Sequence, residues 1–97
     1  MTAKIMIKRT VPAGKKEKFL ALINQLRAKA IKQPGYISGE VMQSAEKPEE
    51  YLVISTWNSA QEWEAWKANP ERQQIQKEID ALLGSETRYE TYQYLVA

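Results

Sequence analysis

The sequence predicts an α+β fold of the ferredoxin-like kind, a four-stranded antiparallel sheet with helices on one face. Three observations predict it. Four stretches are rich in β-branched, aromatic and apolar residues, and helical periodicity fills the gaps after the first and the third of them. The second and third stretches are joined by a short charged loop that suits a hairpin. The resulting order, βαββαβ, is that of the split-βαβ arrangement.

The first strand is expected at residues 4–11, where Ile5 and Ile7 alternate with lysines. Residues 14–32 are expected to form a long amphipathic helix, because apolar residues recur there at steps of three and four. Gln33-Pro34-Gly35 ends this helix, since proline cannot continue it and disfavours a helical residue before it. The apolar stripe of the helix consists of Phe19, Leu22, Ile23, Leu26 and Ala30.

Residues 36–44 and 51–57 are expected to form the second and third strands. Gly39 is predicted to mark a bulge or bend in the second strand. The loop between the strands, residues 45–50, is charged and contains proline. Strands joined this closely should pair antiparallel.

The second helix is expected at residues 59–68. Ser59 followed by Glu62 forms a predicted capping box, in which the hydroxyl and the carboxylate each satisfy a backbone N–H. Trp63 and Trp66 lie about one turn apart and therefore share a face. Each can bury roughly 150–250 Å², so we expect this stretch to organise the core.

Asn69-Pro70-Glu71 is expected to restart the helix, with Asn as N-cap and Pro at the first helical position. The restarted helix ends at Gly84, and residues 86–96 form the last expected strand. The apolar face of this helix carries Ile75, Ile79, Leu82 and Leu83, and the last strand carries Tyr89, Tyr92 and Tyr94.

Both faces of the third strand, residues 51–57, are largely apolar, whereas two helices cover only one face of a sheet. A second copy of the chain, related by a two-fold axis, is the simplest cover for the other face. The sequence therefore predicts a homodimer through the sheet. The alternative is that the aromatic rings of the strands lie exposed on a monomer.

Length, composition and net charge limit the kinds of protein that this sequence can encode. A chain of 97 residues, 43% hydrophobic and 27% charged, is expected to be a single soluble domain, residues 1–97. No apolar run reaches the length of a membrane span, and the N-terminal residues lack a secretory pattern, so we expect a cytoplasmic protein without a membrane partner. The net charge is +2 and no nucleic-acid motif is present, so no nucleic-acid partner is expected.

The sequence contains no Cys and no His. Thiolate chemistry, the commonest neutral-pH acid–base and the usual transition-metal and haem ligand are therefore missing. Pairs of Ser or Cys with His are impossible, and we expect no metal site and no cofactor. Metal sites made only of carboxylates stay open as the alternative.

The chain resembles the antibiotic-biosynthesis monooxygenase domain family. The resemblance spans essentially the whole chain and is strongest in YLVISTW, NSAQE and EAWKANPERQQ, with KRTVPAGKKEKF and QPGYISGEV in the same style. It implies a dimeric α/β barrel. It also implies membership of a group that includes small oxygenases acting on polycyclic phenols without metal or flavin.

The haem-degrading branch of that family carries Asn before Arg on the first strand, Trp on the second helix and His ten residues after it. Here Lys8 precedes Arg9, Trp66 is present, and Gln76 stands at the position of the His. Glutamine is no useful haem ligand, so the resemblance disfavours haem degradation.

A pocket is expected between the sheet and the second helix. The candidate catalytic residues are Trp66, which can stack on a flat substrate, Gln76, which can hydrogen-bond a substrate oxygen, and Lys8, which can stabilise an anion. The candidate substrate-binding residues are Trp63, Trp66, Arg72 and Tyr92.

Each candidate also has a structural alternative. Trp63 and Trp66 are equally compatible with core packing, Gln76 and Lys8 with solvation, and Arg72 with an ion pair to Glu71 or Glu78. Tyrosine is also a preferred strand and interface residue, which applies to Tyr92.

Three functions remain open on the sequence. The first is a cofactor-independent monooxygenase or related oxidoreductase that acts on an aromatic, phenolic or quinol-type small molecule. The second is a non-catalytic module that binds a small apolar ligand in the same pocket. The third is a dimerisation module that serves another enzyme.

Overall fold

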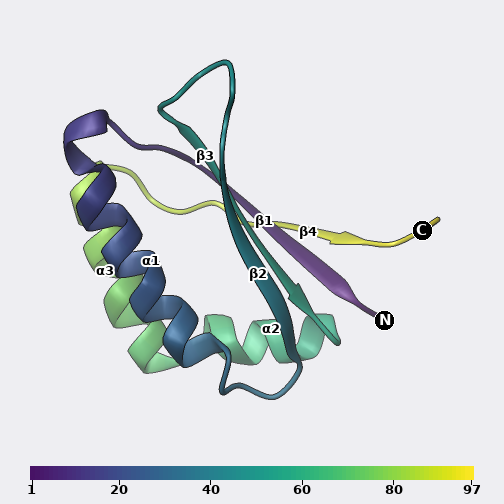
Figure 1. Ribbon diagram of the computed structural model, residues 1–97. Coiled ribbons are helices and arrows are strands. Elements are labelled where there is room, and N and C mark those ends of the chain that lie inside the picture. The colour runs from purple at the N-terminus through teal and green to yellow at the C-terminus, as the bar shows by residue number, and fades with distance from the viewer.

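The computed structural model describes residues 1–97 and has the expected ferredoxin-like α+β fold. The helices all lie on one side of the sheet (Figure 1). In chain order the elements are β1 (Ala3–Thr10), the short 3₁₀ turn η1 (Ala13–Lys15), α1 (Lys16–Ala30), β2 (Tyr36–Gln43), β3 (Glu50–Trp57), α2 (Ala60–Lys67), α3 (Pro70–Leu83) and β4 (Glu90–Gln93). None of these helices is long and apolar enough to cross a membrane.

The strand order in the sheet is β2-β3-β1-β4, and every neighbouring pair is antiparallel. Because β1 lies inside the sheet, its residues have partners on both sides: Ile5 lies opposite Ser55 of β3 and Thr91 of β4. This position gives alternate side chains of β1 direct access to the helical layer.

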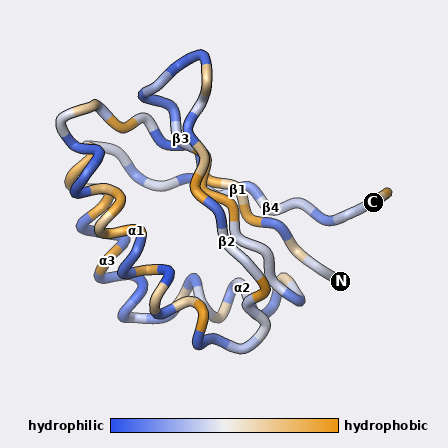
Figure 2. The backbone as a smooth tube through the Cα atoms, viewed as in Figure 1, coloured by the Kyte–Doolittle hydropathy of each residue, from blue (hydrophilic) through white to orange (hydrophobic).

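The helix-facing side of β1 carries Ala3, Ile5, Ile7 and Arg9, and the first two are fully buried. The residues between them, Lys4, Met6 and Lys8, point to the open side of the sheet. In Figure 2 orange, apolar segments alternate with blue, hydrophilic ones along α1, α3 and β1. Alternation along β1 therefore places Arg9, and not Lys8, on the interior side.

Two apolar clusters fill the space between sheet and helices. The first lies toward the C-terminal half of α3 and contains Val11, Phe19, Leu22, Tyr51, Ile75 and Ile79. The second lies beneath α2 and contains Ile5, Ala30, Trp57, Trp63 and Trp66. All three tryptophans of the chain therefore belong to one cluster.

The structure confirms one of the two hydrogen bonds of the capping box predicted for α2. Ser59 Oγ accepts a hydrogen bond from the Glu62 N–H at 3.2 Å. The Glu62 carboxylate, however, accepts from the Ser59 hydroxyl at 2.9 Å and not from a backbone N–H. Asn69 caps α3 as predicted, accepting from the N–H groups of Glu71 and Arg72, and Gly84 ends α3 in the left-handed conformation.

Three predicted features differ from the structure: the bulge in β2, the extent of the first helix and the extent of the last strand. The bulge in β2 lies at Ile37, between the pairs Tyr36–Trp57 and Ser38–Thr56, and not at Gly39. Glycine is needed at residue 39 for another reason, because a Cβ there would lie 2.7 Å from the Tyr36 hydroxyl. The expected helix 14–32 is divided into η1 and α1, with α1 ending at Ala30.

The last strand is also shorter than predicted, since β4 covers Glu90–Gln93 and not residues 86–96. The residues between Gly84 and β4 form no regular structure. Their polar groups instead bond to Arg9 and to α3, which replaces the strand ladder there.

Gly35 offers a direct test of this packing. It has φ +84°, and a Cβ on it would lie 2.4 Å from the Glu62 side chain, whereas Gly84 has φ +71° with nothing within 4 Å. We expect Gly84→Ala to cost about 1 kcal/mol of unfolding free energy, the left-handed penalty alone. Gly35→Ala is expected to cost up to about 1 kcal/mol more, because the Glu62 carboxylate must move and give up its hydrogen bond from the Ser59 hydroxyl. Urea unfolding of both variants measures the difference, and equal losses would contradict the proposed contact.

Candidate functional site

A cavity of about 90 Å³ lies between the helix-facing side of the sheet and the three helices. An ordered water needs only roughly 10–15 Å³, so the space exceeds what packing defects leave. Arg27, which is exposed on α1, lies where this cavity reaches the surface. The deeper walls are mostly apolar and include Ile7, Leu26, Ala30, Val53, Trp57, Trp63 and Trp66.

The tryptophans are at once core residues and cavity walls. Trp63 and Trp66 are 3% and 5% exposed, and both line the cavity. The Trp63 ring lies 6.0 Å from the Trp57 ring and 5.5 Å from the Tyr89 ring, centroid to centroid. The sequence left open whether these tryptophans pack the core or line a pocket. The two interpretations are compatible, because both side chains belong to the core cluster and both border the cavity.

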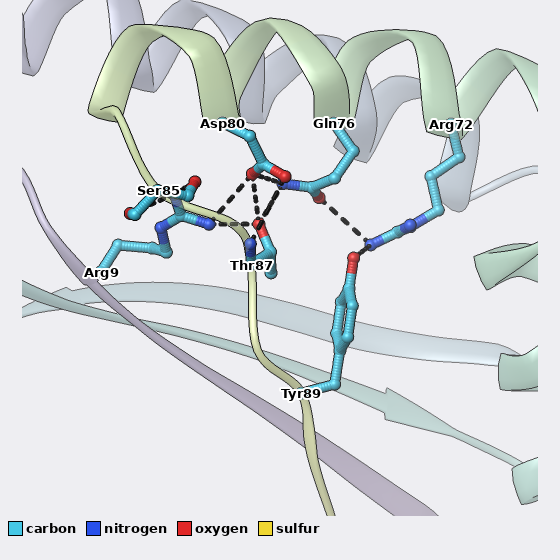
Figure 3. A network of polar contacts seen from close by, with 7 residues as sticks. All are labelled: Arg9, Arg72, Gln76, Asp80, Ser85, Thr87 and Tyr89. Carbon is cyan, nitrogen blue, oxygen red and sulfur yellow. Dashed lines mark hydrogen bonds and ion pairs between the residues drawn. The ribbon is translucent and has the colours of Figure 1, made fainter.

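One wall of the cavity is polar and is held together by a hydrogen-bond network (Figure 3). Arg9 forms an ion pair with Asp80 at 3.1 Å and donates to the Ser85 carbonyl at 2.9 Å. Thr87 accepts from Arg9 and donates to Asp80 at 2.6 Å. Arg9 is 5% exposed, so this pair is shielded from solvent on the arginine side.

Gln76 connects this ion pair to a second arginine. Its side-chain nitrogen donates to Asp80 at 3.1 Å and also to Thr87, and its oxygen accepts from Arg72 at 3.2 Å. Both amide hydrogens are engaged, so Gln76 lines the cavity with a fixed orientation. The alternative of a solvated Gln76 is wrong.

Arg72 is buried, with 4% of its surface exposed, and lines the cavity. It donates to the Tyr89 hydroxyl at 2.7 Å, and its guanidinium carbon lies 5.3 Å from the Trp63 ring centre and 5.1 Å from that of Tyr89. No carboxylate pairs with it. The expected alternative of a Glu71 partner is wrong, because Glu71 pairs with Lys29 at 2.9 Å on the surface.

The surroundings of Asp80 act on its pKa in opposite directions. Partial burial raises it, but hydrogen bonds from Thr87 and Gln76 and the contact with Arg9 outweigh burial and hold the pKa below its ordinary value of 3.8. Asp80 is therefore ionised at neutral pH and balances the charge of Arg9.

Two of the candidate residues do not join this group. Lys8 lies opposite Leu52 in the sheet and points to the open face, because it is one residue from the inward-facing Arg9. Tyr92 lies opposite Lys4 on the same open face, and its hydroxyl donates to Glu90 at 3.1 Å. Neither lines the cavity, whereas Trp63, Trp66, Arg72 and Gln76 all do.

Sequence reasoning missed Arg9, Asp80, Thr87 and the bonding role of Tyr89. One signal was available: Arg9 continues the spacing of Ile5 and Ile7 and so belongs to the interior face. Thr87 and Tyr89 gave no signal, because their positions depend on a segment that departs from the expected strand. No group of three or more His, Cys, Asp or Glu is arranged to hold a metal ion.

A ferredoxin-like sheet with helices on one face and an apolar cavity between the two layers places the chain among small α+β proteins of this fold. Residues 2–78 match the family model of antibiotic biosynthesis monooxygenases, and the chain belongs to that family.

Solved structures share the fold. SnoaB of Streptomyces nogalater, a cofactor-independent oxygenase, superposes with a TM-score of 0.87 at 18% identity, over 99% of this chain and 95% of that one. A conserved protein of Methanosarcina mazei Go1 gives 0.87 at 22% identity, over 96% and 92%. Rv0793 of Mycobacterium tuberculosis gives 0.86 at 12% identity, over 100% and 98%.

Among curated proteins, the 42.8 kDa protein in the whiE locus of Streptomyces coelicolor is 30% identical over 63 residues. The match covers 65% of this chain but spans only 16% of that relative's length.

Proposed function

We propose that this protein is a cofactor-independent monooxygenase or related oxidoreductase that acts on an aromatic, phenolic or quinol-type small molecule, as a cytoplasmic homodimer. The observation that carries the proposal is the cavity in which Trp63 and Trp66 stand beside the buried cation of Arg72. The family and the fold shared with SnoaB, a cofactor-independent oxygenase, support it.

The chemistry needs an electron-rich substrate whose anion gives an electron to O₂. With an anthrone, the methylene carbon becomes a carbonyl: one oxygen atom enters the product, and the other leaves as water with the two methylene hydrogens. The substrate supplies all the electrons, so no further reductant is required. The protein has to exclude water and stabilise the anion, which a buried guanidinium in an apolar cavity does well.

The roles of the residues follow from their places. Trp66 offers a flat, apolar surface for ring stacking, with Trp63 beside it. Arg72 stabilises negative charge in the cavity. Gln76 is a positioning residue, because its oxygen holds Arg72 while its nitrogen is held by Asp80.

Oxygen uptake with a panel of hydroquinones and anthrones tests the proposal. We expect turnover by the wild type and a fall in kcat/KM of about tenfold in Trp66→Phe, since a smaller ring loses stacking area and leaves a gap. Tyr51→Phe is the matched control, because Tyr51 is buried in the other apolar cluster and does not line the cavity.

Absence of uptake with every member of the panel, combined with quenching of tryptophan fluorescence by the same compounds, would favour a binding module. Equal losses in Trp66→Phe and Tyr51→Phe would show that stability and not the site is affected.

The homodimer is proposed through the open face of the sheet. The helices cover only the other face (Figure 1), while the open face carries Met6, Met42, Leu52 and Ile54 among charges of both signs. Met42 and Tyr92 remain 49% and 48% exposed in the single chain. A two-fold axis would place this face against itself and dehydrate it, giving Lys8 and Tyr92 an interface role and not a catalytic one.

A further inference from the structure

The charges around the cavity do not balance. The charged residues that line it are Arg9, Arg27, Arg72 and Glu40. Arg9 is matched by Asp80, and Arg27 is exposed and therefore hydrated. Glu40 is exposed too, and its side chain lies on the open face of the sheet, opposite Ile54. Arg72 alone is buried without a counter-charge.

A buried cation without an anion is costly unless something else stabilises it. Trp63 and Tyr89 stack on Arg72 and supply part of the stabilisation, on the order of 1 kcal/mol each. Lys67 lies 4.9 Å from the centre of the same Tyr89 ring, so a second cation adds to the positive potential here. The protein therefore maintains a positive charge at this wall when simple core packing would favour an apolar residue.

The hydrogen-bonding capacity of Arg72 is also incomplete. A guanidinium has five N–H donors, and Arg72 uses three, to the Lys67 carbonyl, Gln76 and Tyr89. Two N–H groups therefore have no protein acceptor. The Tyr89 hydroxyl accepts from Arg72, and its own hydrogen has no protein acceptor either.

We propose that Arg72 binds a permanently ionised group, a carboxylate on the aromatic ligand, and so makes this cavity selective for aromatic carboxylates. Both Nη2 hydrogens of Arg72 are used by Gln76 and Tyr89, so a carboxylate oxygen can accept a charge-assisted hydrogen bond from one of the two remaining N–H groups. At neutral pH a carboxyl group with a pKa near 4 is ionised, whereas a phenol with a pKa near 10 is not. The proposal rests on the proposed function, because it specifies the substrate class of that same cavity.

Isothermal titration without O₂ tests it at pH 7 with three probes: 2-naphthoate, naphthalene-2-carboxamide and 2-naphthol. The ring system is the same in all three, so differences report the polar group. We expect 2-naphthoate to bind about tenfold or more tightly than the carboxamide, the scale of one charge-assisted hydrogen-bond pair. The proposal would be overturned if the carboxamide or 2-naphthol bound as tightly as 2-naphthoate. This comparison uses the wild-type protein alone.

Two variants locate the selectivity. Arg72→Gln is expected to remove the preference for 2-naphthoate over the carboxamide. Arg27→Gln, the matched control, removes an exposed cation at the mouth of the same cavity and should change the preference less than about twofold, because water screens that charge. Equal losses in the two variants would show a general charge effect and overturn the assignment to Arg72.

Arg72→Lys covers the case in which Arg72→Gln does not fold. It keeps the charge but not the positions of the guanidinium N–H groups, so it should retain a reduced preference for 2-naphthoate. A preference undiminished in Arg72→Lys would overturn the assignment to the N–H groups of Arg72, because charge alone would then select the carboxylate. None of the probes can be oxygenated without O₂, so these results are independent of oxygen uptake: an inactive protein can still select the carboxylate, and an active one can fail to.

Discussion

Asp80→Asn is expected to lower the free energy of unfolding at pH 7 by about 3 kcal/mol. The substitution keeps the shape of the side chain but leaves Arg9, which is 5% exposed, without its counter-charge. Breaking a buried ion pair typically costs about 3–5 kcal/mol, and the lower end applies because the Asp80 side chain is 26% exposed. Urea unfolding followed by tryptophan fluorescence measures the loss.

The chain offers a matched control for this prediction. Glu71→Gln breaks the ion pair between Lys29 and Glu71, whose side chains are 42% and 71% exposed. An exposed pair contributes about 0–1 kcal/mol, so this variant should remain close to the wild type. A loss in Asp80→Asn no larger than that in Glu71→Gln would mean that the network around Arg9 is not what holds α3 to the sheet.

The carboxyl group of Asp80 also makes the free energy of unfolding depend on pH. The pKa of Asp80 is lower in the folded protein than its ordinary value of 3.8. The unfolded chain therefore takes up the proton first as pH falls, and the stabilisation, fully present above about pH 4, is lost as pH drops through the lower folded pKa. Asp80→Asn should lack this pH-dependent part of the stability. The free energies of unfolding of the wild type and of Asp80→Asn, plotted against pH, should therefore approach each other in acid.

The fold could be read from the sequence because its signals are local. Ser59, Asn69 and Gly84 each set a helix boundary through neighbouring backbone groups, and the structure places all three at such boundaries. The alternation of Ile5 and Ile7 likewise fixes which side of β1 is interior. The ferredoxin-like order then follows from the sequence of elements.

The site was less accessible to such reasoning because its contacts are long-range. Arg9 meets Asp80 across most of the chain, and Arg72 meets Tyr89 only because the segment after Gly84 leaves the strand conformation. Lys8 was proposed because its ammonium group could stabilise an anion if it pointed inward, but strand alternation turns it outward. Trp63 and Trp66 were found because a large aromatic pair on one helical face is visible without tertiary information.

Leu52→Lys is expected to convert the proposed dimer into a monomer. Leu52 lies on the open face of β3 between Lys8 and Met42 and is half-buried, so a lysine there is tolerated in a single chain. In a two-fold dimer every substitution occurs twice, and two added charges would be dehydrated in one interface beside existing lysines. We expect the dissociation constant to rise by about a hundredfold or more, corresponding to about 2.7 kcal/mol.

Sedimentation equilibrium over a range of concentrations measures this, with Gln25→Lys as the control. Gln25 is exposed on α1, on the opposite side of the molecule from the open sheet face, so the variant makes the same change in net charge away from the proposed interface. A wild type that stays monomeric at high concentration would contradict the dimer. Leu52→Lys dissociating no more than Gln25→Lys would place the interface elsewhere, and the apolar open face of β3 would then need another explanation.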